Sequence, residues 1–152
     1  MIEVYVDGTC QPKNPGGTAA FGFIVRKDGK TIGKGYGVVG TGEGMSNNVA
    51  EYSGLNEALR WLITHPQEDE VTICSDSKML INQSNGRWAV NKGAYISYYV
   101  ESKDLVKELN IKVIFKWIPR DQNMDADALS QLAYQEASKL DRPKEDQPPR
   151  ED

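Results

Sequence analysis

Alternating hydrophobic and polar positions predict strands at the start of the chain. Residues 2–6 alternate and lead into Asp7 and a glycine, which predicts a strand with one buried face that ends at this acid. Residues 19–26 and 31–39 are two further strand-like stretches, and the Asp28-Gly29 pair between them suits a tight hairpin turn. These segments predict a three-stranded antiparallel meander. Alternate glycines in the third stretch indicate an edge position or a close backbone approach.

Helical spacing follows in the middle of the chain. Hydrophobic residues recur at helical steps over 49–63, so we expect a helix that begins near Asn47 and ends before Pro66. Residues 70–76 form a short stretch rich in β-formers, and a short helix is predicted over 77–83. A strand that leads into a helix is typical of a crossover connection, so this strand should run parallel to its neighbour.

The C-terminal part completes the predicted domain. Apolar spacing predicts helices over 95–109 and 123–140, with an alternating strand over 111–118 between them. The order βββ-α-β-α-α-β-α indicates an α/β fold, with a five-stranded mixed sheet flanked by helices. Residues 1–140 should form this single domain. Residues 141–152 have no large apolar side chain and contain three prolines, so we expect a disordered, charged, proline-rich tail.

Composition narrows the class of protein. A chain of 152 residues with 39% apolar content can bury one adequate core, and its formal charge of −4 disfavours a generally basic nucleic-acid coat. Cys10 and Cys74 lack metal-ligand spacing, and the first residues do not read as a signal peptide. We therefore expect a cytoplasmic protein with reduced, packed thiols. No apolar run approaches the roughly 20 residues that cross a bilayer, so no membrane partner is expected.

Four acids stand out by their positions. Asp7 and Asp76 close two apolar strands, Glu51 shares a helix face with leucines, and Asp127 lies near the start of the last helix. A carboxylate in such a place costs free energy unless a cation meets it. If the four acids converge, their oxygens form a site for hard divalent metal ions.

Each acid also has a purely structural interpretation. Asn48 and Glu51 fit the spacing of a capping box, in which the glutamate only bonds the start of its helix. Asp125 competes with Asp127, and either could serve only as a first-turn helix charge. The two strand-end aspartates could be ordinary turn residues.

Several motifs occur together in one order over residues 1–138. They are Asp7-Gly8-Thr9-Cys10, Asn14-Pro15-Gly16-Gly17, Asn47-Asn48-Val49-Ala50-Glu51-Tyr52, Cys74-Ser75-Asp76-Ser77, Trp117-Ile118-Pro119-Arg120 with Asn123, and Ala126-Asp127-Ala128-Leu129. In this combination the chain resembles type 1 ribonuclease H, in particular its compact archaeal-like branch. The Ala-Asp-x-Leu motif selects Asp127 over Asp125.

The resemblance implies a ribonuclease H-like fold and an endonuclease that hydrolyses the RNA strand of RNA/DNA hybrids, leaving 5′-phosphate and 3′-hydroxyl ends. It assigns catalysis and metal binding to Asp7, Glu51, Asp76 and Asp127, with two Mg²⁺ ions and Mn²⁺ as a possible substitute. Asp7 would bridge both ions and Asp127 would hold the ion that activates water. A nuclease for double-stranded RNA and an inactive hybrid-binding module are the alternatives.

The resemblance also suggests substrate contacts. Candidates for sensing ribose 2′-hydroxyls are Asn14, Asn47, Asn48 and, more weakly, Gln83. Candidates for phosphates of the second strand are Ser46, Arg87, Trp88 and Lys92. Their structural alternatives are turns, helix caps and plain surface.

Two departures from the family pattern matter. The loop before Asp127 carries Arg120 where many relatives have a histidine, and Arg120 could steady a phosphate but not act as an acid. The span 86–93 is too short for the basic handle of some bacterial relatives, so weaker hybrid affinity is expected.

Overall fold

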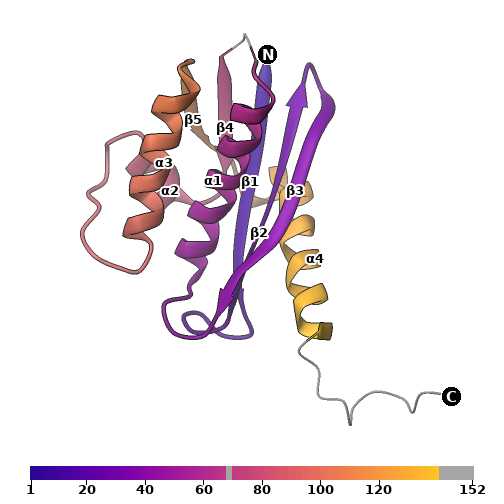
Figure 1. The fold of residues 1–152 in the computed structure, drawn as a ribbon, viewed down its shortest axis with the longest axis vertical. Helices are drawn as coiled ribbons and strands as arrows, with labels where there is room; N and C mark the ends of the chain where they lie inside the picture. The colour runs from indigo at the N-terminus through magenta and orange to yellow at the C-terminus, as the bar shows by residue number, and fades with distance from the viewer. Residues whose placement is uncertain (68–69, 141–152) are drawn as a thin grey trace, which may run out of the picture.

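The computed structural model describes residues 1–67 and 70–140, and the tail predicted for 141–152 lies outside the described residues. The elements are β1 (Ile2–Gln11), β2 (Thr18–Lys27), β3 (Lys30–Thr41), α1 (Asn47–Thr64), β4 (Val71–Ser75), α2 (Lys78–Ser84), α3 (Ile96–Leu109), β5 (Val113–Trp117), the 3₁₀ turn η1 (Arg120–Gln122) and α4 (Met124–Leu140). Figure 1 shows one sheet with helices on both sides, which confirms the predicted fold class. Among the elements of the described residues, η1 alone was not predicted.

The sheet has the strand order β3-β2-β1-β4-β5. β1, β2 and β3 pair antiparallel, and β4 pairs parallel with both β1 and β5. The hairpin between β2 and β3 turns through Asp28 and Gly29, whose φ angles of 50° and 82° are the left-handed values that this tight turn needs. β3 is an edge strand, which confirms the first interpretation of its glycines, and the side chain of Trp61 in α1, not a second backbone, packs directly against Gly33.

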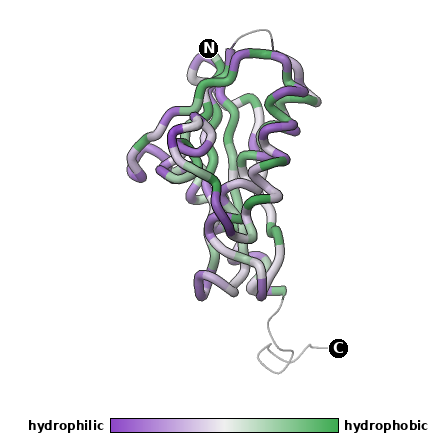
Figure 2. Tube along the Cα trace, turned by 90° about the vertical axis from the view of Figure 1, so that its left-hand side faces the viewer, coloured by the Kyte–Doolittle hydropathy of each residue, from purple (hydrophilic) through white to green (hydrophobic). Residues whose placement is uncertain are grey.

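The core lies between the sheet and α1. Leu55, Leu59 and Leu62 of α1 are buried against Val4 and Val6 of β1. Hydrophobic colour follows the central strands in Figure 2, while the outer loops are mostly hydrophilic. Burial of apolar surface at about 25 cal/mol per Å² makes this layer the main source of stability.

The prediction that β1 ends at Asp7 is wrong, because the strand continues to Gln11 and pairs with β2 over its whole length. Gly8 does not terminate the strand. A Cβ atom on Gly8 would lie 2.4 Å from the Ala50 carbonyl carbon and the Glu51 nitrogen. The glycine is present because the start of α1 approaches the strand this closely.

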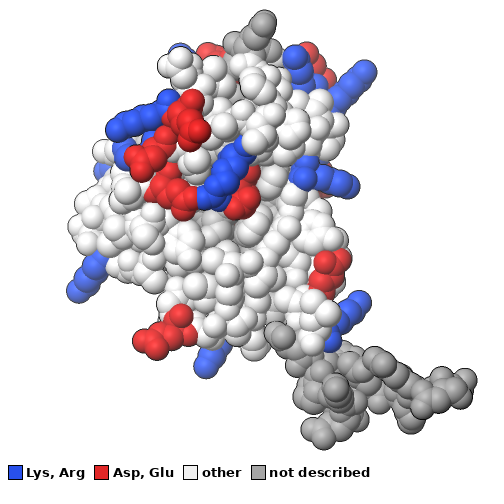
Figure 3. Space-filling view, viewed as in Figure 1, with Lys and Arg blue, Asp and Glu red and all other residues white. Residues whose placement is uncertain are grey.

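Charged groups are spread over the outer surface. On the face shown in Figure 3, acidic and basic side chains lie intermixed. Among the ion pairs of the molecule, Arg60 of α1 pairs with Glu57 and with Glu101 of α3. Cys10 and Cys74 are free and buried, as expected for packed thiols. Among the described residues, we find no helix with the length and apolar character needed to span a bilayer.

The close approach at Gly8 generates a stability prediction. Gly8→Ala should lower the free energy of unfolding by about 3 kcal/mol or more, because the new methyl group meets main-chain atoms that cannot rotate away. Gly40→Ala is the matched control, since its Cβ would meet only the flexible Met45 side chain, with Sδ at 3.3 Å. Urea unfolding measures both variants, and equal losses of stability would contradict this account.

Candidate active site

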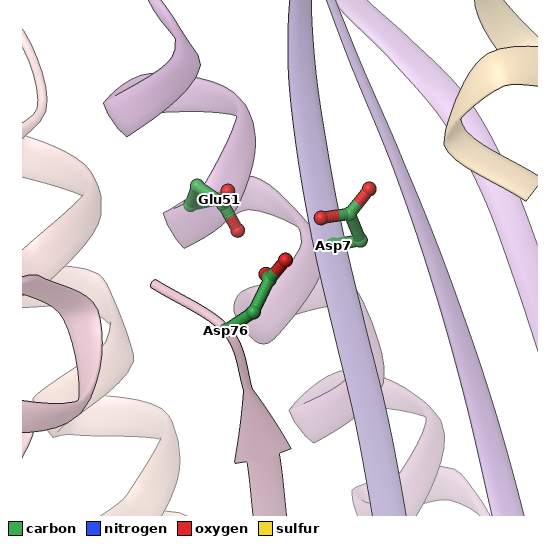
Figure 4. A group of neighbouring side chains, drawn as sticks. All are labelled: Asp7, Glu51 and Asp76. Atoms are coloured by element: carbon green, nitrogen blue, oxygen red, sulfur yellow. The ribbon is translucent and has the colours of Figure 1, made fainter. Parts of the chain in front are cut away.

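Three carboxylates from separate elements meet at one place. Asp7 from β1, Glu51 from α1 and Asp76, which follows β4, each offer an oxygen, and these oxygens lie within 4.8 Å of one another. Figure 4 shows the three side chains turned toward a common space. They line a cleft together with Asp127 of α4. All four acids singled out in the sequence are thus brought to one site.

The sheet topology explains how side chains from opposite faces can meet. Asp7 pairs with Gly22 in the β1–β2 register, and a Cβ atom on Gly22 would touch α4, so Asp7 points to the α4 side of the sheet. Glu51 comes from α1, which contacts the other side at Gly8. Pairing between β1 and β4 ends at Tyr5. Beyond that point no β4 backbone separates the two faces, and Asp7 and Glu51 can approach each other.

Asp125 and Asp127, the two candidate acids in the first turns of α4, face different cavities. Asp127 lines the cleft, whereas Asp125 pairs with Arg26 and lines a different cavity. Ser130, one turn after Asp127, places its hydroxyl 2.8 Å from the Asp7 carboxylate as a donor. Sequence reasoning missed Ser130, although its spacing of three residues from Asp127 puts both on one helix face.

A buried amide holds the third aspartate. Asn123 is 1% exposed, and its Nδ2 donates to the Val6 carbonyl at 2.8 Å and lies 3.5 Å from the Asp76 carboxylate. It therefore connects β1 with the end of β4 at the level of the site. Asn123 belonged to the sequence motifs, but its contact with Asp76 follows only from the fold.

The site is electrostatically unfavourable without a cation. Burial raises the pKa of Asp7 from 3.8 to about 7, and the charges of Asp76 and Asp127 add to this rise while the Ser130 hydrogen bond opposes it. Burial also raises the pKa of Glu51 well above its ordinary value. One Glu51 oxygen, Oε2, is buried without a hydrogen-bond partner. A hard divalent cation fits these residues, because it would neutralise the charges and bind the unpaired oxygen.

Polar groups form the rest of the cleft. Its lining residues are Asp7, Gly8, Thr9, Cys10, Asn14, Asn47, Glu51, Asp76, Arg120, Asp127 and Gln131. The Asn14 Oδ1 accepts a hydrogen bond of 3.0 Å from the Asn47 amide, which ties the loop after β1 to the start of α1. Asn14, Asn47 and Arg120, all singled out in the sequence, therefore lie at the site.

Other predicted contacts lie elsewhere. Ser46 is the N-cap of α1, and its hydroxyl accepts a hydrogen bond of 3.2 Å from the Val49 amide. The capping-box interpretation of Asn48 and Glu51 is therefore wrong, since Ser46 occupies the cap. Asn48 is half-buried and not among the cleft-lining residues, and its substrate contact stays a prediction.

The prediction that Gln83 contacts substrate is contradicted by its burial. Gln83 is only 3% exposed, and its amide is fully engaged with Tyr52, Tyr95 and the Ala89 carbonyl. Helical spacing could not reveal this, because α2 is too short to show which of its faces is buried.

Replacing Asp7 should change how stability depends on pH in the absence of metal. Because the pKa of Asp7 is about 7 in the folded chain against an ordinary 3.8, the folded state keeps a proton that the unfolded state has lost between these values. The free energy of unfolding therefore falls as pH rises through this range. Asp7→Asn removes this part of the fall and should be more stable than the parent at about pH 8 by up to roughly 4 kcal/mol.

Urea unfolding in EDTA at several pH values measures this difference. Asp125→Asn is the matched control, because Asp125 lies two residues from Asp127 but faces Arg26 instead of the cleft. It should leave the pH slope unchanged. Parallel pH profiles for the parent and Asp7→Asn would show that Asp7 is not held protonated by its surroundings.

Comparison with known proteins identifies the family. Residues 5–133 match the family model described as reverse transcriptase-like. The bifunctional protein Rv2228c of Mycobacterium tuberculosis is 32% identical over 97 residues, which are 61% of this chain and 25% of that protein. The chain thus spans about a quarter of the length of that relative. EbsB of Enterococcus faecalis, a candidate hydrolase, is 29% identical over 137 residues, which are 89% of this chain and 95% of that one.

Solved structures agree with this assignment. The N-terminal RNase H domain of Rv2228c has a TM-score of 0.82 at 27% identity, covering 93% of this chain and 98% of its own. An RNase H1 isolated from compost, solved with an RNA/DNA hybrid, has a TM-score of 0.82 at 26% identity, covering 91% and 99%. RNase H1 of Halobacterium salinarum has a TM-score of 0.79 at 26% identity, covering 89% and 98%. The resemblance inferred from the motifs is confirmed, and the chain belongs to the reverse transcriptase-like family with the fold of type 1 ribonuclease H.

Proposed function

We propose that this chain is a metal-dependent endonuclease that hydrolyses the RNA strand of RNA/DNA hybrids. The observation that carries the proposal is the group formed by Asp7, Glu51 and Asp76, whose oxygens lie within 4.8 Å of one another in a cleft shared with Asp127. A solved relative of the same fold is an RNase H1 bound to an RNA/DNA hybrid, which supports this substrate. An inactive binding module would not need to maintain four mutually repelling acids.

The four carboxylates are the residues that would hold divalent ions, with Mg²⁺ the expected metal and Mn²⁺ a substitute. When bound, two such ions supply activation of a water molecule and stabilisation of the leaving 3′-oxygen, which gives 5′-phosphate and 3′-hydroxyl products. Asp7 shares the cleft with Glu51, Asp76 and Asp127, and by the family resemblance it would contribute to holding both ions. The raised pKa of Asp7 and Glu51 means that metal uptake releases protons.

Neighbouring groups pre-orient these ligands. Ser130 donates to Asp7, Asn123 lies against Asp76, and the Gly8 amide donates to the Glu51 carboxylate. Such contacts fix side-chain rotamers before the substrate arrives, which lowers the cost of forming the reactive arrangement. The elements β1, α1, β4 and α4 together therefore hold the four acids in position.

The side-chain amides of Asn14 and Asn47 and the guanidinium group of Arg120 would recognise the RNA at the cleft. Asn14 and Asn47 can donate to ribose 2′-hydroxyls, which are the groups that distinguish RNA from DNA. Arg120 is exposed beside the acids and can bind a phosphate. His65, the single histidine of the chain, stacks on Trp61 at the end of α1, with ring centroids 4.1 Å apart, and takes no part in this site. We expect the protein to act as a monomer in the cytoplasm.

Cleavage of a labelled hybrid tests the proposal. The parent should cut the RNA strand in Mg²⁺ or Mn²⁺ and not in EDTA, and Asp76→Asn should lower kcat/KM by at least about 100-fold because one metal ligand is lost. Asp125→Asn, outside the cleft, should retain activity. Metal-independent cleavage, or full activity of Asp76→Asn, would exclude the metal mechanism. Faster cleavage of double-stranded RNA than of the hybrid would instead favour the alternative substrate.

The proposed contact between Asn47 and a ribose 2′-hydroxyl can be tested by measuring cleavage rates. The parent is expected to slow on hybrids that carry 2′-deoxy substitutions beside the cleaved bond, and Asn47→Ala should lower kcat/KM on the unmodified hybrid by about tenfold. The variant should then be less sensitive to the deoxy substitutions than the parent, since the Asn47 contact is already absent and only that of Asn14 remains. Gln67→Ala, at the opposite end of α1, should keep the sensitivity of the parent. Undiminished sensitivity in Asn47→Ala would assign 2′-hydroxyl recognition to other residues.

A further inference from the structure

Asp76 lies between two regular elements, at the point where β4 leads into α2. The paired residues of the β4–β5 ladder end with Ser75 and Trp117, and α2 begins at Lys78. Figure 4 shows Asp76 on the connection that leaves the β4 arrow, with its carboxylate turned toward Asp7 and Glu51. A carboxylate on such a connection keeps one orientation only if neighbouring groups hold it there.

Trp117, the last residue of β5, reaches this connection with its side chain. The indole Nε1 of Trp117 donates a hydrogen bond of 3.2 Å to the Asp76 carbonyl. A separate contact reaches the carboxylate, because the Asn123 Nδ2 lies 3.5 Å from its Oδ1. Asp76 is thus held through its main chain by β5 and through its side chain by the residue that precedes α4.

The indole of Trp117 is itself held by α2. The Lys78 ammonium lies 5.2 Å from the centroid of the Trp117 ring, which is the distance of a cation–π contact. Just after α2, the Asn85 Nδ2 donates to the Phe115 carbonyl of β5 at 3.2 Å. These two contacts join α2 to β5 at both ends of the helix, and they keep the indole beside Asp76.

Burial does not account for the presence of a tryptophan at this position. Trp117 is 42% exposed, so it contributes less apolar burial than a fully buried tryptophan would. Trp117 belongs to the Trp-Ile-Pro-Arg motif, of which only Arg120 lines the cleft. The hydrogen bond to the Asp76 carbonyl is the contact that connects Trp117 with the site.

We propose that Trp117 is a positioning residue that sets the orientation of Asp76 as a ligand for a divalent ion. This inference rests on the metal dependence of the proposed function. Trp117 does not line the cleft, so it touches neither the substrate nor the reacting atoms and acts through the main chain of Asp76. Loss of the indole N–H frees the connection after β4 and weakens metal binding, while the proposed RNA contacts of Asn14 and Asn47 stay intact. The effect therefore appears in metal affinity and not in KM for the hybrid.

Binding of Mn²⁺ to the free protein tests the inference, with the free ion measured by electron paramagnetic resonance. Trp117→Phe removes the N–H and keeps an aromatic ring beside Lys78, and it should weaken Mn²⁺ binding about tenfold. Hybrid cleavage should need about tenfold more Mn²⁺ for its half-maximal rate and recover at high Mn²⁺, with KM for the hybrid within about twofold of the parent. An unchanged Mn²⁺ affinity in Trp117→Phe would overturn the inference.

Trp61→Phe is the matched control. Trp61 packs against Gly33 and stacks on His65, and it does not line the cleft. The loss of its indole N–H should therefore leave Mn²⁺ affinity at the parent value. An equal loss of Mn²⁺ affinity in Trp61→Phe would show that the effect at Trp117 is general destabilisation, and this too would overturn the inference.

A closer replacement separates the hydrogen bond from the packing of the ring. The amino acid 3-benzothienylalanine has the bicyclic shape of tryptophan with sulfur in place of the N–H, so it removes the bond to Asp76 even if Trp117→Phe fails to fold. Replacing Trp117 with it should weaken Mn²⁺ binding by a similar factor, and parent-like affinity would overturn the inference. If the parent binds no Mn²⁺, the proposed function and this inference fail together. If the parent binds Mn²⁺ and cuts no hybrid, the proposed function alone fails.

Discussion

Repulsion between buried carboxylates is the constraint on which the rest of this structure depends. Oxygens of Asp7, Glu51 and Asp76 lie within 4.8 Å of one another, and burial removes much of the hydration of Asp7 and Glu51. Such a group lowers stability, and it persists because the surrounding fold holds each acid from a different element. The core between α1 and the sheet supplies the opposing free energy, since its leucines and valines are fully buried.

The two helices that carry the acids approach the sheet unusually closely, and from opposite sides. Gly8 allows α1 to contact β1, and Gly22 on the neighbouring strand allows α4 to contact β2, where a Cβ atom would lie 2.7 Å from the Ala126 carbonyl oxygen. Gly22 is the register partner of Asp7. Both close contacts therefore occur at the level of the site. Any side chain there would push one helix outward and separate the acids that it carries.

Much of this arrangement could be predicted from the sequence, because hydrophobic periodicity reports burial directly. It located the strands and helices, and the motifs located the four acids. Other features depend on contacts between distant segments. Ser130 becomes relevant only when α4 lies against β1, and the extension of β1 beyond Asp7 becomes visible only when β2 is paired along its whole length. Gln83 was misjudged because a polar residue on a short helix gives no sign of which neighbours will bury it.

The location of Asp127 on the last described helix has a consequence for synthesis of the protein on the ribosome. β1 is made first, yet it receives Ser130 and Asp127 only after about 120 further residues have been added and α4 has docked on the sheet. A partly synthesised chain can build its hydrophobic layer early and still lack Asp127, the last of the four acids in the cleft. The four acids of the cleft should therefore not come together until α4 has emerged from the ribosome.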